Sequence, residues 1–283
     1  MGLIRGESFG RDEVHVSHLQ FADDTMIFLK PKIDYVLNLK RILRCFELSS
    51  GLKINFHKSC LMSVGKNKRR VELWAGLMNC RAVDLPILYL GLHLGARSRA
   101  RSFWDPVVTK IENRLAPWKR KCISKSGRLI LIKSILNSIP MVFLSVFKMP
   151  IGVAKRIVKL QRGFLWGDEV VKRKVHAVHW DSVCCSKKKG GLGIGKMVDK
   201  NNGMIAKWIW RFGNEGDSIW KSVICSKYGI NKDRLVWDWS CPRVPSQFVR
   251  AVVAILKPGS RLEQVCNVGF KEVLGSGKGL RLW

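Results

Sequence analysis

The clearest hydrophobic pattern lies near the start of the chain, where two apolar runs flank a pair of acidic residues. Aromatic, β-branched and aliphatic side chains dominate both runs, which cover residues 18–21 and 25–29. Between them stand Asp23 and Asp24. This pattern predicts a strand, a tight turn and a second strand. Because side chains alternate along a strand, we expect the two carboxylates to point in different directions.

A helix is predicted next, over residues 33–48, because apolar residues recur there at helical spacing and Gly51 follows as a stop. Residues 52–57 then alternate apolar and polar, which predicts a strand with one buried face. Hairpin, helix and strand in this order favour an antiparallel sheet covered by helices on one face and open on the other.

The second half of the chain is predicted to be mainly helical. Trp104–Pro106 is typical of a helix start, and the four apolar residues from Val107 to Leu115 give the following segment a buried face. Residues 204–228 predict two short amphipathic helices, with Trp208 and Trp220 in the core. Residues 269–283 are typical of a strand-prone or frayed end. The predicted fold class is therefore α+β.

Composition narrows the class of partner. The chain has 283 residues, 47% of them apolar, which is enough for a buried core. Lys and Arg number 51 against 21 Asp and Glu, a formal charge of +30 that favours a polyanionic partner. Nucleic acid is the first expectation, since 11 tryptophans are interleaved with the charge. A basic protein without such a partner, or one on anionic membranes, is the alternative.

Cysteine usage and hydropathy indicate the compartment. The nine cysteines are odd in number and scattered, which predicts reduced thiols. The N-terminus lacks a signal-peptide core, and charged residues and proline interrupt the apolar stretch 129–149. We expect no membrane span and no secretion, and a nuclear or cytoplasmic location.

Basic residues concentrate between positions 97 and 133, where the composition shift predicts a domain boundary near residue 96. An ordinary solvated helix face is the alternative to a nucleic-acid contact. The candidate nucleic-acid-binding residues in this run are Arg97, Arg99, Arg101, Lys119, Arg120, Lys121 and Arg128.

The adjacent carboxylates of Asp23 and Asp24 are the main candidate for chemistry. Hydrophobic flanks make such a pair costly unless a cation holds it, and Mg²⁺ in nucleotide-handling sites takes one or two protein carboxylates together with substrate phosphates. A solvated β-turn or a helix cap would explain the dipeptide taken by itself.

The sequence His18–Phe28 resembles the catalytic hairpin of reverse transcriptases, specifically those of plant non-LTR retrotransposons (long interspersed elements). Two later blocks resemble that family in the same order: Gly51–Asn55 with Lys58 and Ser59, and then Leu85–Gly95, which is similar to the primer grip. Further similarity extends to about Tyr228. It rests on Trp118, Ser126–Arg128, Phe164–Gly167, His179, Trp180, Val183, Cys184 and Gly190–Gly193. The sequence departs from the family at His93, where proline is usual, and at Cys185 and Ser186.

The resemblance implies three regions. Residues 1–95 would be the C-terminal part of a polymerase palm, residues 96–165 a basic helical thumb, and residues 166–283 a partly helical connector truncated at its end. Asp23 would be a Mg²⁺ ligand, Asp24 an auxiliary ligand and Lys58 a more distant candidate for protonating pyrophosphate. Tyr89 and Gly91 would contact the primer. The implied partners are an RNA template and a DNA primer, or an RNA–DNA hybrid.

The resemblance also implies that the site is incomplete. Such polymerases hold two Mg²⁺ ions between carboxylates from two strands, and the other strand lies upstream in the family. The expected protein is a reverse transcriptase fragment that is inactive without the missing upstream polymerase segment. A non-catalytic basic nucleic-acid-binding module and a non-functional retrotransposon relic are the alternatives.

Two weaker patterns occur near residue 190. His176, His179, Cys184 and Cys185 are zinc-ligand residue types, but a second ligand pair at the usual spacing is missing. The glycine-rich segment 190–195 lacks the preceding strand of a dinucleotide-binding loop, so we expect an ordinary glycine-rich turn.

Overall fold

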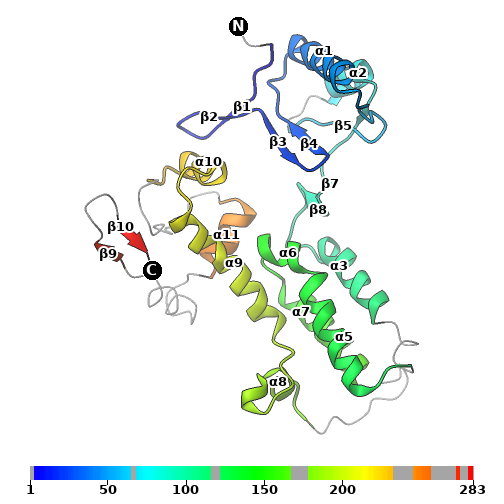
Figure 1. The fold of residues 1–283 in the computed structure, drawn as a ribbon, viewed down its shortest axis with the longest axis vertical. Coiled ribbons are helices and arrows are strands. Elements are labelled where there is room, and N and C mark those ends of the chain that lie inside the picture. Colours follow the sequence, from blue (N-terminus) through cyan, green and yellow to red (C-terminus); the bar gives the residue numbers. More distant parts are fainter. Residues whose placement is uncertain are drawn as a thin grey trace. The chain divides into compact units, whose positions relative to one another are not determined.

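The computed structural model describes residues 3–64, 68–115, 122–166, 178–231, 245–255, 272–274 and 280–282. The chain forms two compact units (Figure 1). The N-terminal unit comprises Met1–Gly95 and Glu215–Arg234, and the helical unit comprises Ala96–Asn214 and Leu235–Trp283. The junction between Gly95 and Ala96 lies beside the shift in composition near residue 96. Nothing in the sequence indicates that residues 215–234 belong to the N-terminal unit.

The N-terminal unit combines short hairpins with three helices. Its elements are β1 (Glu7–Phe9), β2 (Val14–Val16), β3 (His18–Phe21), β4 (Asp24–Ile27), α1 (Ile33–Ser50), β5 (Cys60–Leu61), α2 (Lys68–Met78), β6 (Arg81–Ala82), β7 (Ile87–Tyr89), β8 (Leu92–Leu94) and α10 (Ile219–Tyr228). Each strand has one partner: β1–β2, β3–β4 and β7–β8 are antiparallel, and β5–β6 is parallel. The α+β class is confirmed. The prediction of one antiparallel sheet covered by helices is wrong, because the strands of the described residues form separate two-stranded sheets.

Helix α1 confirms the predicted amphipathic helix and extends it by two residues. Val36 and Leu39 are buried and pack with Met78 of α2, while Ile27 and Leu29 from the end of the β3–β4 hairpin join the same cluster. Gly51 ends the helix with a φ of 72°, a left-handed conformation that glycine adopts without steric cost. Its N–H donates to the Glu47 carbonyl at 3.1 Å.

Helix α10 docks onto the β1–β2 hairpin, more than 200 residues earlier in the chain. The backbone carbonyl of Ser226 accepts from the Arg11 N–H at 3.0 Å, and its Oγ accepts from the Asp12 N–H at 2.7 Å. Gly10 has a φ of 77°, and a Cβ there would lie 2.3 Å from the Ser226 Oγ. The turn therefore requires glycine for its conformation and for the close approach of α10.

The helical unit consists mainly of packed helices. Its elements are α3 (Arg101–Arg114), α5 (Lys125–Ser138), α6 (Met141–Val146), α7 (Ile151–Trp166), α8 (Trp180–Cys184), the 3-10 helix η1 (Lys187–Lys189), α9 (Met197–Asn214), α11 (Gln247–Val253) and the antiparallel strands β9 (Glu272–Leu274) and β10 (Leu280–Leu282). These two strands agree with the strand-prone end predicted for residues 269–283.

The core of the helical unit is aromatic and aliphatic. Trp104 is fully buried and donates its indole N–H to the Ser98 carbonyl at 2.8 Å, and Phe103 packs edge-on against Phe147 with ring centroids 4.9 Å apart. The buried Asn201 of α9 donates to the carbonyls of Leu144 and Phe147, both at 2.8 Å, and accepts from the Met149 N–H. One amide side chain thus connects α9 to the end of α6 and the segment after it.

Two helix boundaries differ from the prediction. Helix α3 begins at Arg101 and not at Trp104, so Pro106 lies inside its second turn; burial of Phe103 and Trp104 extends the helix toward its N-terminus. The predicted apolar face on Val107–Leu115 is confirmed. The pair of helices predicted in residues 204–228 is present, but α9 begins earlier, at Met197, and α9 and α10 belong to different units.

Both tryptophans of that region contact protein. Trp208 stacks edge-on against Phe248, with ring centroids 5.1 Å apart, and Trp220 is half-buried and donates to the Glu215 carboxylate. Each agrees with the predicted core role. The seven cysteines in the described residues are free thiols. No helix in this part of the chain combines the length and the apolar character needed to cross a membrane.

Candidate functional site

The β3–β4 hairpin places Asp23 and Asp24 at a two-residue turn, as the sequence predicts. Phe21 pairs with Asp24, so Ala22 and Asp23 form the turn itself. Ala22 has a φ of 52°, while Asp23 has a negative φ, the φ pattern of a type II′ turn, whose first position usually carries glycine. Ala22 therefore adopts a backbone conformation that usually requires glycine.

The carboxylates of Asp23 and Asp24 are exposed. Among the residues that the structure describes, neither Asp23 nor Asp24 has an ion pair or a side-chain hydrogen bond. The side chains beside them, Leu19 and Phe21, are 42% and 64% exposed. The turn thus presents free oxygen ligands next to an open apolar surface.

This donor set meets only part of what Mg²⁺ requires. Two exposed carboxylates without a competing protein cation suit a hard cation. Within the described ranges, however, no group of three or more Asp, Glu, His or Cys side chains converges on a common point. In the described residues, the two carboxylates are fewer protein ligands than a complete metal site would need.

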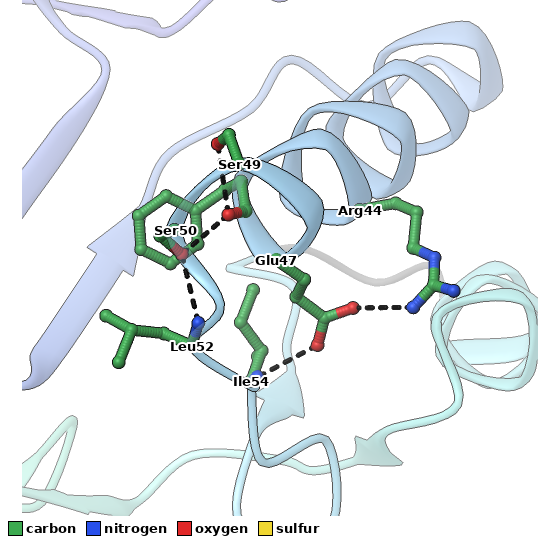
Figure 2. Close-up of polar contacts among 7 residues, drawn as sticks. Arg44, Glu47, Ser49, Ser50, Leu52 and Ile54 are labelled. Atoms are coloured by element: carbon green, nitrogen blue, oxygen red, sulfur yellow. Dashed lines mark hydrogen bonds and ion pairs between the residues drawn. The ribbon is translucent and has the colours of Figure 1, made fainter.

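The segment after α1 differs from the predicted strand. Residues 51–55 are irregular and residues 56–58 form a turn, although Ile54 and Phe56 are half-buried on the predicted face. Figure 2 shows the cause: the Glu47 carboxylate reaches past the helix end and accepts the Ile54 N–H at 2.9 Å. In this segment the backbone N–H groups of Leu52 and Ile54 donate to side-chain oxygens and not to the backbone of a neighbouring strand.

Glu47 holds this segment from two directions. Besides the Ile54 N–H, its carboxylate accepts from the Arg44 guanidinium at 3.2 Å (Figure 2). The hydrogen bond from Ile54, followed by that from Arg44, lowers the pKa of Glu47 below its ordinary value of 4.5. Sequence reasoning missed Glu47. The available signal was an acid in the last turn of a helix, where the helix dipole disfavours negative charge.

Lys58 lies at the end of the same segment and is exposed. Its N–H donates to the Asn55 carbonyl and to the Asn55 Oδ1, both at 3.1 Å, so a local turn sets its position. A cavity of about 660 Å³ adjoins it, lined by Lys53, Ile54, Asn55, Phe56, His57 and Asn79. No contact between Lys58 and the Asp23–Asp24 turn is present.

The β7–β8 hairpin contains Tyr89 and Gly91. Leu90 and Gly91 have φ values of 48° and 79°, the conformation of a type I′ turn, so Gly91 has a sufficient structural reason to be glycine. Tyr89 is half-buried and pairs with Leu92. The primer-contact role of both residues stays a prediction.

The arginines at the start of the helical unit point into solvent. Arg97, Arg99 and Arg101 are all exposed. Between them Ser98 is buried, and its N–H donates to the Gln247 Oε1 of α11 at 3.0 Å, while the Gln247 Nε2 donates to the Ala96 carbonyl at 3.1 Å. A side chain about 150 residues away therefore fixes the turn that presents the arginines.

The other predicted basic contacts are placed differently. Arg128 is half-buried, and its Nε donates to the Ile123 carbonyl at 3.1 Å, which stabilises the start of α5. Lys119, Arg120 and Lys121 lie outside the described residues, as does His176. His179 is exposed and caps α8 by accepting the Asp181 N–H.

The glycine-rich segment is a turn, as predicted. The N–H groups of Gly190, Gly191 and Gly193 donate to the carbonyls of Lys187, Ser186 and Cys185. With these donors satisfied internally, the glycine backbone offers no cradle for phosphate.

Two known proteins that are similar to this chain come from a plant. No protein-family model matches the sequence. A protein of Arabidopsis thaliana named provisionally as a ribonuclease H protein is 32% identical over 177 residues, which are 62% of this chain and 28% of that protein. An uncharacterized mitochondrial protein of Arabidopsis thaliana is 22% identical over 147 residues, which are 52% of this chain and 90% of that protein.

These similarities agree with the coarser part of the resemblance drawn from sequence motifs. Both relatives are plant proteins, and together they support a retrotransposon-related origin of the chain. The chain spans little more than a quarter of the length of the first relative.

Proposed function

We propose that the chain is part of a plant non-LTR retrotransposon reverse transcriptase, containing the C-terminal part of the palm and the thumb. The observation that carries the proposal is the β3–β4 hairpin, which exposes Asp23 in its turn and Asp24 at the start of β4, with no ion pair to either among the described residues. The motif blocks that follow it in family order support the same assignment.

In the proposed intact enzyme, two Mg²⁺ ions held by carboxylates from two strands would promote attack of the primer 3′-hydroxyl on the nucleotide α-phosphate. Asp23 would be a ligand and Asp24 an auxiliary ligand, with Lys58 near the leaving pyrophosphate. This chain supplies carboxylates from one hairpin only. We therefore expect no polymerase activity without a further polymerase segment.

The proposed partner is an RNA–DNA hybrid, or an RNA template with a DNA primer. A formal charge of +30 and the exposed Arg97, Arg99 and Arg101 support a sequence-independent contact with phosphates. The same observations favour the second candidate function, a non-catalytic nucleic-acid-binding module, because the arginine turn is held entirely within the helical unit.

The ribonuclease H activity in the name of one relative is not proposed for this chain. The similarity covers only 28% of that relative, so the activity in its name need not belong to the matched part.

A chimera tests the catalytic part of the proposal. Fingers and the first palm strand from a similar intact element, fused upstream of this chain, should restore Mg²⁺-dependent DNA synthesis on an RNA template. Asp23→Asn should abolish synthesis, since an amide lacks the charge that holds the ion, and Asp24→Asn should weaken it less. Asp12→Asn, an exposed acid on the β1–β2 turn, is the matched control and should leave synthesis intact.

Synthesis that survives Asp23→Asn, or synthesis by the unextended chain, would contradict the assignment of the hairpin. Binding without synthesis in the chimera would favour the non-catalytic module.

Salt dependence tests the nucleic-acid contact in the unextended chain. With about six phosphates neutralised, affinity for an RNA–DNA hybrid should fall on the order of a thousandfold between 50 and 200 mM salt. Reversing Arg97, Arg99 and Arg101 to Glu should weaken binding and flatten this dependence. A shallow dependence in the wild type, or no effect of the reversal, would rule out the thumb assignment.

A further inference from the structure

A second group of basic side chains lies in the helical unit, around the glycine-rich turn at residues 190–193. Lys187, Lys188 and Lys189 form η1 and are all exposed. Lys133 of α5 approaches the turn that follows: its Nζ lies 3.7 Å from the position that a Cβ on Gly193 would occupy, and the Lys187 Cγ lies 3.9 Å from the same point. The chain thus brings two lysines from elements more than 50 residues apart to one glycine.

The turn that carries Lys187 is firmly held. The Leu192 N–H donates to the Val183 carbonyl at 3.0 Å, and the Gly193 N–H donates to the Cys185 carbonyl at 2.7 Å. A Cβ on Gly191 would lie 2.2 Å from the Cys185 oxygen, so the turn packs directly on the end of α8. Buried Val183 and Ile194 anchor both sides. The lysines are therefore presented by a fixed support.

The acid on the neighbouring helix α8 is already paired with another lysine. Asp181, on α8, pairs with Lys196 at 2.8 Å, and this interaction lowers the pKa of Asp181. In the described part of the chain, neither Lys133 nor Lys187 has an ion pair. The Lys133 ammonium group and the stem of Lys187 meet at Gly193. Positive charge there that no carboxylate of the described residues pairs with would attract an anion.

The geometry of η1 separates its three lysines. A 3-10 helix has three residues per turn, so successive side chains project about 120° apart. The Lys187 Cγ lies beside Gly193, so a regular 3-10 helix would project Lys188 and Lys189 in other directions. Lys187 is therefore the lysine of this run that we pair with Lys133.

We propose that Lys133 and Lys187, on either side of Gly193, bind the phosphate backbone of a nucleic acid, as a second contact besides Arg97–Arg101. The inference rests on the proposed nucleic-acid partner. Gly193 has no side chain to occupy the space between the lysines, and lysine binds phosphate as a point charge irrespective of base sequence. The two lysines would contact phosphates of the nucleic acid and would not distinguish one base from another.

The test measures binding of the full chain to a fluorescently labelled RNA–DNA hybrid by anisotropy, between 50 and 200 mM salt. The variant is Lys133→Gln with Lys187→Gln, and the matched control is Lys110→Gln with Lys207→Gln, which removes two exposed lysines from α3 and α9. Circular dichroism checks that both remain folded.

We expect the slope of log affinity against log salt to become shallower by about two in the Lys133 and Lys187 variant. Between 50 and 200 mM salt, the factor by which the affinity of this variant falls should be roughly tenfold smaller than the factor for the wild type. Lys188→Gln should change the slope less than Lys187→Gln does, because its side chain projects elsewhere.

Equal slopes in the variant and the wild type would overturn the proposal, as would an equal change in the control. If the Arg97, Arg99 and Arg101 reversal still lowers affinity in that case, the proposed function stands and only the lysine pair fails. Absence of hybrid binding by the wild type would overturn both. Dependence on the lysine pair for binding phosphatidylserine vesicles but not the hybrid would identify a lipid surface and overturn the nucleic-acid assignment.

Discussion

The two units of the molecule are stabilised in different ways. In the helical unit, long helices satisfy their own backbone hydrogen bonds and enclose most of the buried apolar side chains of the described residues. In the N-terminal unit, two-stranded hairpins predominate, and such hairpins are marginal without further contacts. Its buried apolar residues in the described ranges are Val16, Val36, Leu39, Val71, Ala75, Met78 and Cys225.

This difference explains why the N-terminal unit uses a segment from much later in the chain. Helix α10 supplies Ser226, which bonds to the backbone of Arg11 and Asp12. The hairpin with the candidate carboxylates belongs to the unit with the thinner core. Distant contacts from α10 thus hold the β1–β2 turn, while the acidic turn on the neighbouring β3–β4 hairpin stays exposed.

The largest effect is expected in the core of the helical unit. Trp104→Ala should lower the free energy of unfolding by about 3–5 kcal/mol, since it removes a fully buried indole and its hydrogen bond to Ser98. Ile130→Ala, at a 67% exposed position on α5, should change it by less than about 0.5 kcal/mol. Urea denaturation of both variants checks the contrast, and equal losses would contradict the aromatic core.

Docking of α10 is tested by two glycines with similar backbone conformations. Gly10→Ala should destabilise the N-terminal unit by roughly 3 kcal/mol, combining a left-handed φ with overlap against Ser226. Gly51→Ala has the same φ penalty but open space around it, so about 1 kcal/mol is expected. Hydrogen exchange of the β1–β2 amides provides the measurement.

A similar loss for both glycine variants would show that α10 does not pack on the β1–β2 turn. Faster exchange confined to β1–β2 in Gly10→Ala alone would support the docking.

The polar connection in the helical unit should have an intermediate effect. Asn201→Ala leaves the buried Met149 N–H and two carbonyls without their partner, which should cost about 2–3 kcal/mol. Asn202→Ala removes one contact with Lys148 and should cost less than about 1 kcal/mol. Thermal unfolding ranks the two variants, and the reverse order would contradict the role of Asn201.

The smallest effect concerns the segment after α1. Because the folded-state pKa of Glu47 is lowered, its stabilising contribution is present above its ordinary pKa of 4.5 and is lost as pH falls through the folded value. The Ile54 amide chemical shift should therefore titrate with a midpoint below 4.5. Glu47→Gln should remove this titration, and a midpoint above 4.5 would contradict the contact.

Short-range features followed from the sequence pattern. The helix over residues 33–48, its stop at Gly51 and the hairpin around Asp23 were all recognised, because helical spacing, the glycine conformation and alternation act between near neighbours.

Predictions that needed a partner residue were wrong or missing. Residues 52–57 alternate like a strand, yet Glu47 captures the Ile54 N–H and the segment stays irregular. Helix α3 begins three residues before the expected Trp104, because burial of that side chain and its bond to Ser98 favour an earlier start. Nothing near Ser98 in the sequence indicates that Gln247 fixes its turn.

The sequence by itself therefore determined the α+β class, the helix over residues 33–48, the apolar helix face on Val107–Leu115 and the acidic turn, because each depends on spacing within a few residues. Only the tertiary structure decided that residues 215–234 complete the N-terminal unit, that Gln247 presents the Arg97–Arg101 turn and that Lys133 meets Lys187 at Gly193. These contacts join residues more than 50 positions apart, and packing selects such pairs from many that local patterns leave equivalent.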